Sequence, residues 1–173
     1  MTPRALRTAD APAIREFLDG LPESDLNFFK EDLSEEGVKA WFGDGPAHRV
    51  VVADAGGRVL AYAAVFPGLG WSSHVGELRL IVDSKTRRQG LGRMLARWGL
   101  VESVRMGLEK LVVELVADQE AAVAMFRNLG FEGEALLLNQ VRDRGGALRD
   151  LIVLAHEVRG NAASLAVTGL GEP

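Results

Sequence analysis

The sequence predicts a single α/β domain with a mixed, mostly antiparallel, twisted sheet that is flanked by helices. Three observations predict it. The chain has 173 residues, and one domain usually takes about 100 to 200. Its composition, 47% hydrophobic and 25% charged, is typical of a chain that can bury a core. The local patterns run from helices to hairpins, then alternate strand and helix, and end in a hairpin. We expect the domain over residues 1–158 and a flexible tail over 159–173, which is rich in small residues without a period.

The first 41 residues predict short helices. Asp10 stands two residues before Pro12, in the position of a capping residue. Four apolar residues follow at helical spacing: Ile14, Phe17, Leu18 and Leu21. Ser34 is placed to cap a further helix within residues 23–41. We therefore expect one helix after Asp10 and one or two short helices behind it.

Three strands are predicted next. Apolar runs rich in β-branched residues at 49–54 and 58–66 flank a short link with two glycines, which is typical of a hairpin. Residues 67–73 predict a loop. Residues 75–82 predict a third strand, because Glu77, Arg79 and Ile81 alternate with Leu78, Leu80 and Val82.

The second half alternates helix and strand. The predicted elements are a helix from Gly92 to about Arg105, a strand over 111–116, a helix over 119–129, and two strands over 131–141 and 147–156. The run 111–116 is interrupted only by Glu114 and is short enough for a buried strand. Gly130 stands where a left-handed residue ends a helix.

Composition excludes several classes of protein. The net charge of −4 lacks the basic footprint of a nucleic-acid binder. Without cysteine, there is no thiolate nucleophile, disulfide or Cys-based zinc site, and His48, His74 and His156 lack the spacing of a metal site. No apolar run approaches the ~18 to 20 residues of a membrane span, and the N-terminus does not resemble a signal peptide. We expect a cytoplasmic protein without a metal, nucleic-acid or membrane partner.

The segment between the third strand and the following helix predicts an anion site. Amide N–H groups at a helix N-terminus have no partner within the helix, and the helix dipole adds to their field. Gly90 and Gly92 carry no Cβ that would keep the main chain from an anion. Arg87, Arg88 and Arg93 add positive charge in an acidic chain. The alternative is an ordinary strand-to-helix turn with solvated arginines.

Two common phosphate motifs fit this segment poorly. A P-loop needs Gly, four residues and Gly-Lys-Ser or Gly-Lys-Thr, which is absent. A dinucleotide fold needs a small third residue where Leu95 stands, although Asp118 could serve as its ribose ligand. A third pattern, Arg or Gln, two residues, Gly, one residue, and Gly or Ala, is satisfied from Arg87 to Gly92.

With this third pattern the chain resembles the GCN5-related N-acetyltransferase (GNAT) superfamily. Leu80 to Asp83 is similar to the family's strand before the pyrophosphate loop. Ala122, Phe126 and the Leu-Gly-Phe at 129–131 resemble its second region of cofactor contacts. The resemblance covers roughly residues 4–158 and implies the GNAT fold, with acetyl-CoA as co-substrate.

The resemblance also implies the residues that bind acetyl-CoA. The loop and helix start would hold the pyrophosphate, through Arg87, Arg88, Gln89, Gly90, Leu91, Gly92 and Arg93. The backbone of Leu80, Ile81 and Val82 would bind the pantetheine arm like an added strand. Gln119 would face the thioester, where the family often has Asn. Phe126 replaces the tyrosine with which many members protonate the leaving thiolate.

Glu77 is the candidate catalytic residue, because it resembles the glutamate that several GNAT members use as general base. This role would need a raised pKa or a proton relay. The alternative is a strand carboxylate that merely pairs with Arg79. His74 is a second candidate base, since imidazole titrates near pH ~6.5. Tyr62, the single tyrosine, lies on an earlier strand.

The acceptor is open at this point. Phe28, Phe29, Trp41 and Trp71 are candidates for an acceptor pocket. A small amine or amino-acid-like metabolite is expected. A protein lysine is an alternative acceptor, because the early segment resembles bacterial protein lysine acetyltransferases. A non-catalytic acyl-CoA sensor is the alternative that Phe126 favours. We expect a monomer or a homodimer.

Overall fold

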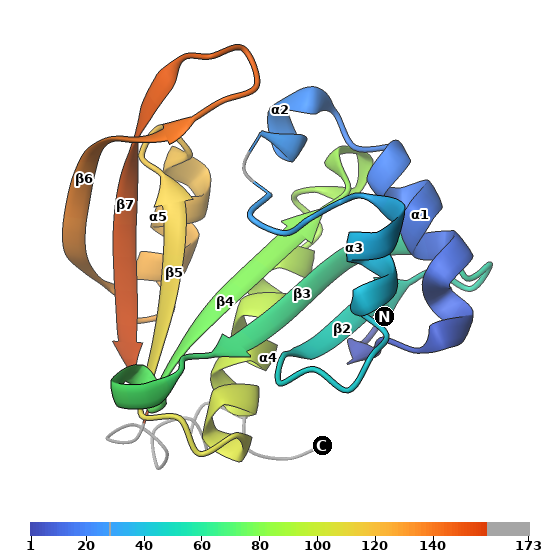
Figure 1. Cartoon of the computed structure of the whole chain (residues 1–173), viewed down its shortest axis with the longest axis horizontal. Coiled ribbons are helices and arrows are strands. Elements are labelled where there is room, and N and C mark those ends of the chain that lie inside the picture. The colour runs from blue at the N-terminus through green and yellow to red at the C-terminus, as the bar shows by residue number, and fades with distance from the viewer. Residues whose placement is uncertain (28, 159–173) are drawn as a thin grey trace.

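The computed structural model describes residues 1–27 and 29–158, which form a twisted sheet between two layers of helices (Figure 1). The strand order is β1-β2-β3-β4-β5-β7-β6. The strands are Arg4–Ala5 (β1), His48–Ala53 (β2), Val59–Pro67 (β3), Val75–Val82 (β4), Lys110–Val116 (β5), Glu132–Arg142 (β6) and Leu148–Glu157 (β7). Neighbouring strands are antiparallel except β4 and β5, which are parallel, so the expected mixed sheet is confirmed. The expected tail, 159–173, lies outside the described residues.

Helices cover both faces of this sheet. The helices are Ala11–Asp19 (α1), Glu23–Leu26 (α2), Glu35–Ala40 (α3), Leu91–Arg105 (α4) and Glu120–Arg127 (α5). Short 3₁₀ turns lie at Thr8–Asp10, Gly70–Ser72 and Ser84–Thr86. In Figure 1, α1 and α3 lie in front of β2 and β3, whereas α4 and α5 lie behind the sheet. No helix within 1–27 and 29–158 is long and apolar enough to cross a membrane.

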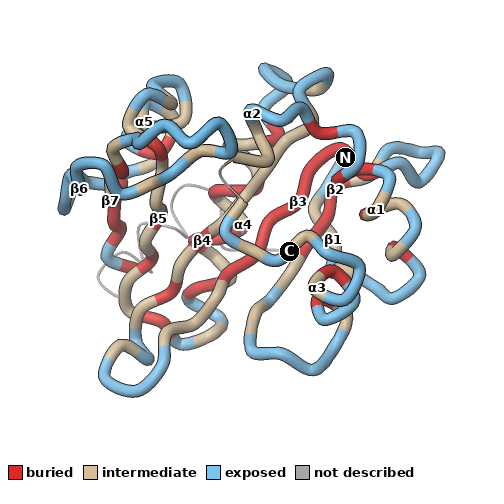
Figure 2. The backbone as a smooth tube through the Cα atoms, turned by 45° about the horizontal axis from the view of Figure 1, so that its top comes forward, coloured by how far each residue is buried: buried red, intermediate tan, exposed pale blue. Residues whose placement is uncertain are grey.

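The central strands are buried on both faces, which explains their continuous apolar sequence. Val51 and Tyr62 pack in the cluster with α1 and α3. Val52 and Ala63 pack in the cluster with α4 and α5. Figure 2 shows β3 buried along most of its length, while the edge strand β6 is exposed.

Two predicted caps are confirmed. Ser34 Oγ accepts the N–H of Gly37 at 3.1 Å and caps α3. Gly130 has a φ of +88°, and the N–H of Phe131 donates to the carbonyl of Phe126 at 3.1 Å. This bond is one half of a Schellman motif, which explains glycine at that position.

The role predicted for Asp10 is wrong. Its side chain makes no capping bond to α1. Instead, its carboxylate accepts two hydrogen bonds from Arg4, both at 2.7 Å, and the N–H of Arg7 at 2.8 Å. The chain reverses in a 3₁₀ turn before the helix begins, which brings Asp10 back beside β1. Asp10 therefore connects β1 to the start of α1 through these hydrogen bonds.

The divergence of β4 from β5 positions the functional site. Only Val75–Glu77 pair with β5, at residues 110–112. Beyond that point β4 follows β3 and β5 follows β7, so the two strands separate as Figure 1 shows. Helix α4 starts after β4, one residue before the predicted Gly92, and brings its N-terminus to the open end.

We expect Asp10→Asn to lower the free energy of unfolding by about 1 to 3 kcal/mol at pH 7, since a buried charged acceptor loses its charge. The hydrogen bonds from Arg4 hold the pKa of Asp10 below its ordinary value. Its stabilising contribution is therefore complete above the unfolded pKa of ~3.9 and is lost as the pH falls through the lower folded pKa. Urea unfolding at pH 7 and near pH 3 measures both effects.

The control is Asp19→Asn, because Asp19 makes an exposed helix pair with Arg15. Such a pair contributes less than about 0.5 kcal/mol. Equal losses in the two variants at pH 7 would contradict the role given to Asp10.

Candidate active site

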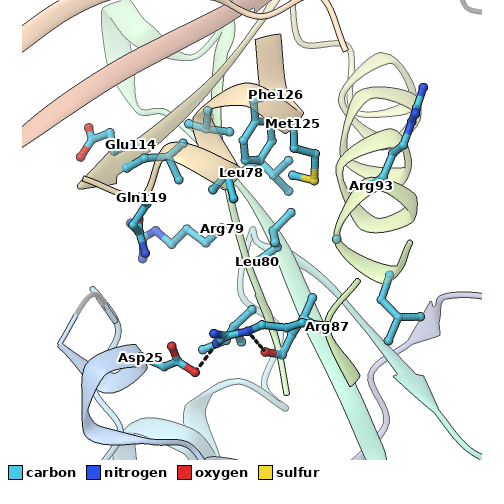
Figure 3. A pocket seen from close by; sticks show the side chains of 18 of the residues that line it. Asp25, Leu78, Arg79, Leu80, Arg87, Arg93, Glu114, Gln119, Met125 and Phe126 are labelled. Carbon is cyan, nitrogen blue, oxygen red and sulfur yellow. Dashed lines mark hydrogen bonds and ion pairs between the residues drawn. The ribbon is translucent and has the colours of Figure 1, made fainter. Parts of the chain in front are cut away.

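A cleft of about 880 Å³ lies between the diverging strands β4 and β5. This volume is within the usual range for small-ligand sites. Twelve of the thirteen residues predicted for the site line it: Glu77, Leu80, Ile81, Val82, Arg87, Arg88, Gly90, Leu91, Gly92, Arg93, Gln119 and Phe126. The remaining one, Gln89, lies exposed in the same loop but does not line the cleft. Figure 3 shows the lining side chains from close by.

Backbone amides form the open end of the cleft. The first bond within α4 runs from the N–H of Met94 to the carbonyl of Gly90, at 2.9 Å. The N–H groups of residues 91–93 precede it and have no partner within the helix. Together with the helix dipole they favour an anion here.

Glycine stands at positions 90 and 92 of this loop for different physical reasons. Gly90 has a φ of +82°, which side chains rarely adopt, and a Cβ there would meet nothing within 4 Å. A Cβ on Gly92 would make ordinary contacts with Met125 Sδ at 3.4 Å and Val82 Cγ2 at 3.8 Å. Packing within the protein therefore does not require glycine at position 92. Arg88 also has a positive φ, +62°, so the loop is held in an uncommon conformation.

The arginine side chains contribute less to the anion site than the sequence suggests. Arg87 donates to the carboxylate of Asp25 on α2 and to the carbonyl of Val82 at 3.3 Å (Figure 3). Arg93 extends along α4, away from Arg87 and Gln119 (Figure 3). The main-chain amides and Arg88, which also lines the cleft, are therefore the groups best placed for an anion.

The long walls of the cleft suit an extended ligand. The edge of β4 after Glu77 has no strand partner among the described residues, so its peptide groups face the cleft. Phe126 on α5 is 2% exposed and packs edge-to-face on Phe131 at 5.1 Å. Gln119 is the residue before α5 rather than part of it, and its Oε1 accepts the N–H of Val116 at 3.3 Å.

Glu77 lies at the apex, where the pairing of β4 and β5 ends. Its Oε1 accepts from Lys30 Nζ at 2.6 Å and from Arg79 Nε at 3.0 Å, and its Oε2 accepts from Arg79 Nη2 at 2.9 Å. Burial by itself raises the pKa of Glu77, but the bonds from Arg79 and Lys30 outweigh it and leave the pKa below the ordinary value. Of the two conditions for a general base, the raised pKa is therefore not met, and a proton relay is the route left to this carboxylate.

Two further acids at the apex were missed in the sequence. Glu114 on β5 accepts from Lys30 Nζ at 2.6 Å. In the sequence, a charged residue inside an apolar strand could have marked Glu114 as a site residue. The Glu31 side chain is 7% exposed and pairs with Arg49 at 3.4 Å. Burial raises the pKa of Glu31, and the charges of Arg49 and Arg79 offset only part of that rise. No sequence pattern marks Lys30 or Glu31, because both lie in an irregular segment between α2 and α3.

The aromatic candidates separate into different environments. Phe29 lines the cleft. Trp41 is buried in the core and stacks on Tyr62 at 4.7 Å between ring centroids. Trp71 is 96% exposed, and Phe28 lies outside the described residues.

His74 is exposed and does not line the cleft, so it is not placed as a base. Within residues 1–27 and 29–158, no three His, Asp or Glu side chains gather to hold a metal ion.

The mixed sheet, the split between two parallel strands and the helix N-terminus at its open end define an α/β protein with a cleft suited to a long anionic ligand. Residues 14–131 match the acetyltransferase (GNAT) family. The chain therefore belongs to that family of acetyltransferases.

A curated relative is the mycothiol acetyltransferase of Arthrobacter sp. (strain FB24), which is 32% identical over 108 residues. The match covers 61% of this chain and 33% of the relative, so the chain spans about a third of the length of the curated relatives it matches.

Solved structures show the same fold at low identity. An N-acetyltransferase from Staphylococcus aureus Mu50 superposes with a TM-score of 0.80 at 20% identity, covering 91% of this chain and 98% of that one. A phosphinothricin acetyltransferase from Sinorhizobium meliloti, in complex with acetyl-CoA, gives a TM-score of 0.74 at 20% identity over 90% and 87% of the two chains. The family and the fold expected from the sequence are confirmed, and acetyl-CoA is the co-substrate of this family.

The single tyrosine permits a direct test of the apex. Burial and the charge of Glu31 strongly raise the pKa of Tyr62. We expect no tyrosinate absorbance in the folded protein at pH values where free tyrosine ionises, near ~10. Ultraviolet titration of the folded chain measures it, and the urea-unfolded chain, with an ordinary midpoint, is the control. An ordinary midpoint in the folded protein would contradict the burial of Tyr62 beside Glu31.

Proposed function

We propose that this chain transfers an acetyl group from acetyl-CoA to a primary amine, by direct attack within a ternary complex. One observation carries the proposal: a single cleft joins the amides at the start of α4 to the carboxylate of Glu77. Val82 lies five positions after Glu77, which is roughly 17 Å of extended strand at 3.3 Å per residue. The cleft therefore suits a long ligand with an anionic end and a reactive end.

The donor would lie along β4. Its pyrophosphate would accept from the N–H groups of residues 91–93 at the start of α4. The pantetheine arm would pair with the free backbone edge of Leu80, Ile81 and Val82, as a strand does. Phe126 would pack on the arm, and the thioester would reach the apex beside Glu77.

The acceptor amine must be neutral to attack, because an ammonium has no lone pair. Lys30 and Arg79 keep Glu77 ionised, so this carboxylate does not stay protonated. It draws the amine proton away through a water molecule, which passes the proton on to solvent. The hydroxyl of Tyr62 donates to Glu31 and accepts from Arg49, so we do not assign it as the acid that protonates the leaving thiolate. The leaving thiol has an ordinary pKa near ~8.5 and takes its proton from solvent.

A small acceptor fits the enclosure of the cleft better than a protein chain. The N–H of Arg144, in the β6–β7 turn, donates to Asn27 Oδ1 at 3.0 Å. This bond joins the turn to the end of α2 beside the open end between β4 and β5 (Figure 1). The curated relatives, named mycothiol acetyltransferases, support a small-molecule acceptor. An amine or amino-acid-like metabolite is therefore the proposed acceptor class.

Release of free CoA thiol tests the reaction. Incubation with acetyl-CoA and a panel of small amines and lysine-containing proteins identifies the acceptor class. Acetylation of proteins alone would replace the small-molecule acceptor by a protein lysine. Binding of acetyl-CoA without release across the panel would favour a non-catalytic sensor.

We expect Glu77→Gln to lower kcat by about 10²-fold or more, because general-base catalysis is lost. The affinity for acetyl-CoA should stay unchanged. The matched control is Glu134→Gln, since Glu134 pairs with Lys110 and does not line the cleft. If Glu77→Gln turns over like the parent while it binds acetyl-CoA, the base assignment fails.

We expect Gly92→Val to weaken acetyl-CoA binding at least ~10-fold, by placing methyl groups against the amides that hold the anion. The fold should persist, because a Cβ at this position meets only ordinary contacts. Thermal shift with acetyl-CoA and with NAD measures binding, since a ligand of the native state raises Tm. Gly92→Ala is the graded control. An unchanged affinity, or stabilisation by NAD alone, would overturn this anion site.

A further inference from the structure

The apex of the cleft already holds a primary ammonium that belongs to the protein. Lys30, on the segment between α2 and α3, places Nζ 2.6 Å from Glu77 Oε1 and 2.6 Å from Glu114 Oε2. The ammonium thus bridges β4 and β5 at the point where they separate. It bonds directly to Glu77, the carboxylate to which the proposed mechanism gives the proton of the acceptor amine.

We propose that Lys30 is an internal acceptor and that the enzyme acetylates the Nζ of its own Lys30 with acetyl-CoA. This inference rests on the proposed function, since it uses the same donor site and the same Glu77. It adds a covalent modification site and makes the segment 29–34 part of the reaction.

The placement of the other lysines makes Lys30 distinctive. The chain has four lysines, all within the described residues. Lys39 lies on α3 and Lys85 in the 3₁₀ turn after β4, and both are exposed. Lys110 pairs with Glu134 at 2.5 Å. Of the four lysines, only Lys30 lines the cleft.

The geometry favours attack on the thioester by Lys30 over attack by a surface lysine that no other residue positions. A reactant held near its target reacts faster than the same group in solution, because its translational freedom is already lost. Glu77 and Glu114 hold Nζ from two sides, and the Lys30 side chain is 40% exposed, so solvent reaches it. Figure 3 shows Glu114 at the β5 wall of the cleft and Arg79 at the β4 wall.

The step balances without another reactant. The ammonium of Lys30 gives one proton through Glu77 to water, and the resulting amine attacks the thioester carbonyl carbon. A C–N bond forms, the nitrogen gives a second proton to solvent, and the C–S bond breaks. CoA leaves as a thiolate that takes one proton from solvent. The products are N-acetyl-Lys30, CoA thiol and one released proton. The neutral amide can no longer bridge Glu77 and Glu114, so the segment that carries it loses both ion pairs.

The experiment incubates the full chain with acetyl-CoA and no added acceptor, and maps acetylated peptides over time. We expect Lys30 to be acetylated at least ~10-fold faster than Lys39, as a positioned amine should be. The rate constant should not change with protein concentration, because the acceptor belongs to the same molecule. Gly92→Val should remove the difference between the two lysines at low acetyl-CoA concentration.

Three controls separate enzymatic from chemical acetylation. Lys30→Arg keeps a cation between the two carboxylates and should abolish the preferred modification, with circular dichroism to show that the variant folds. Lys39→Arg changes an exposed lysine outside the cleft and should leave acetylation of Lys30 unchanged. In the urea-unfolded chain, Lys30 and Lys39 should react at similar rates.

Acetylation of Lys30 no faster than that of Lys39 would overturn the inference, and so would a rate constant that rises with protein concentration. The proposed function is scored separately, by the thermal shift with acetyl-CoA and by CoA release with added amines. If both of these succeed and Lys30 stays unmodified, only the internal acceptor fails. If neither succeeds, the proposed function fails together with it.

Discussion

β4 and β5 pair over three residues and then separate, because each is held along its length by a different neighbour. β4 follows β3 as far as Val82, and β5 follows β7 as far as Val116. In the interior of a sheet, every backbone N–H and C=O finds a strand partner. The separation leaves one edge of β4 without such a partner, inside a cleft instead of at the rim of the molecule. A ligand that satisfies these groups can therefore bind where the sheet would otherwise be closed.

Charge at the apex follows from the same separation. Three carboxylates line the cleft there with two cations: Glu77, Glu114 and Glu31 with Lys30 and Arg79. A third cation, Arg49, pairs with Glu31 without lining the cleft. Buried charges are costly unless they are paired, so the network is nearly balanced. The balance is uneven in detail: two cations bond directly to Glu77 and hold its pKa down, whereas burial dominates at Glu31 and raises its pKa. Two carboxylates with pKa values moved in opposite directions are typical of sites that move protons.

The sequence predicted most of the fold and most of the residues that line the cleft where we propose that the donor binds. Hairpin spacing, helical periodicity and the glycine cap at Gly130 depend on residues close together in the chain, and these predictions are confirmed. The loop from Arg87 to Gly92 is equally local, since strand, turn and helix start follow one another without interruption. The prediction for Asp10 failed because its partner Arg4 approaches through a chain reversal that no short pattern records.

By itself, the sequence determined the order of the elements, the position of the helix start that we propose as the anion site, and the presence of Glu77 on the strand before it. These depend on backbone conformation, which neighbouring residues set. Only the tertiary structure decided what surrounds Glu77. Lys30 reaches it from 47 residues away and reaches Glu114 across 84 residues. Long-range ion pairs of this kind form only when packing of the helices on the sheet brings the segments together, so the acceptor half of the site appears only in the folded chain.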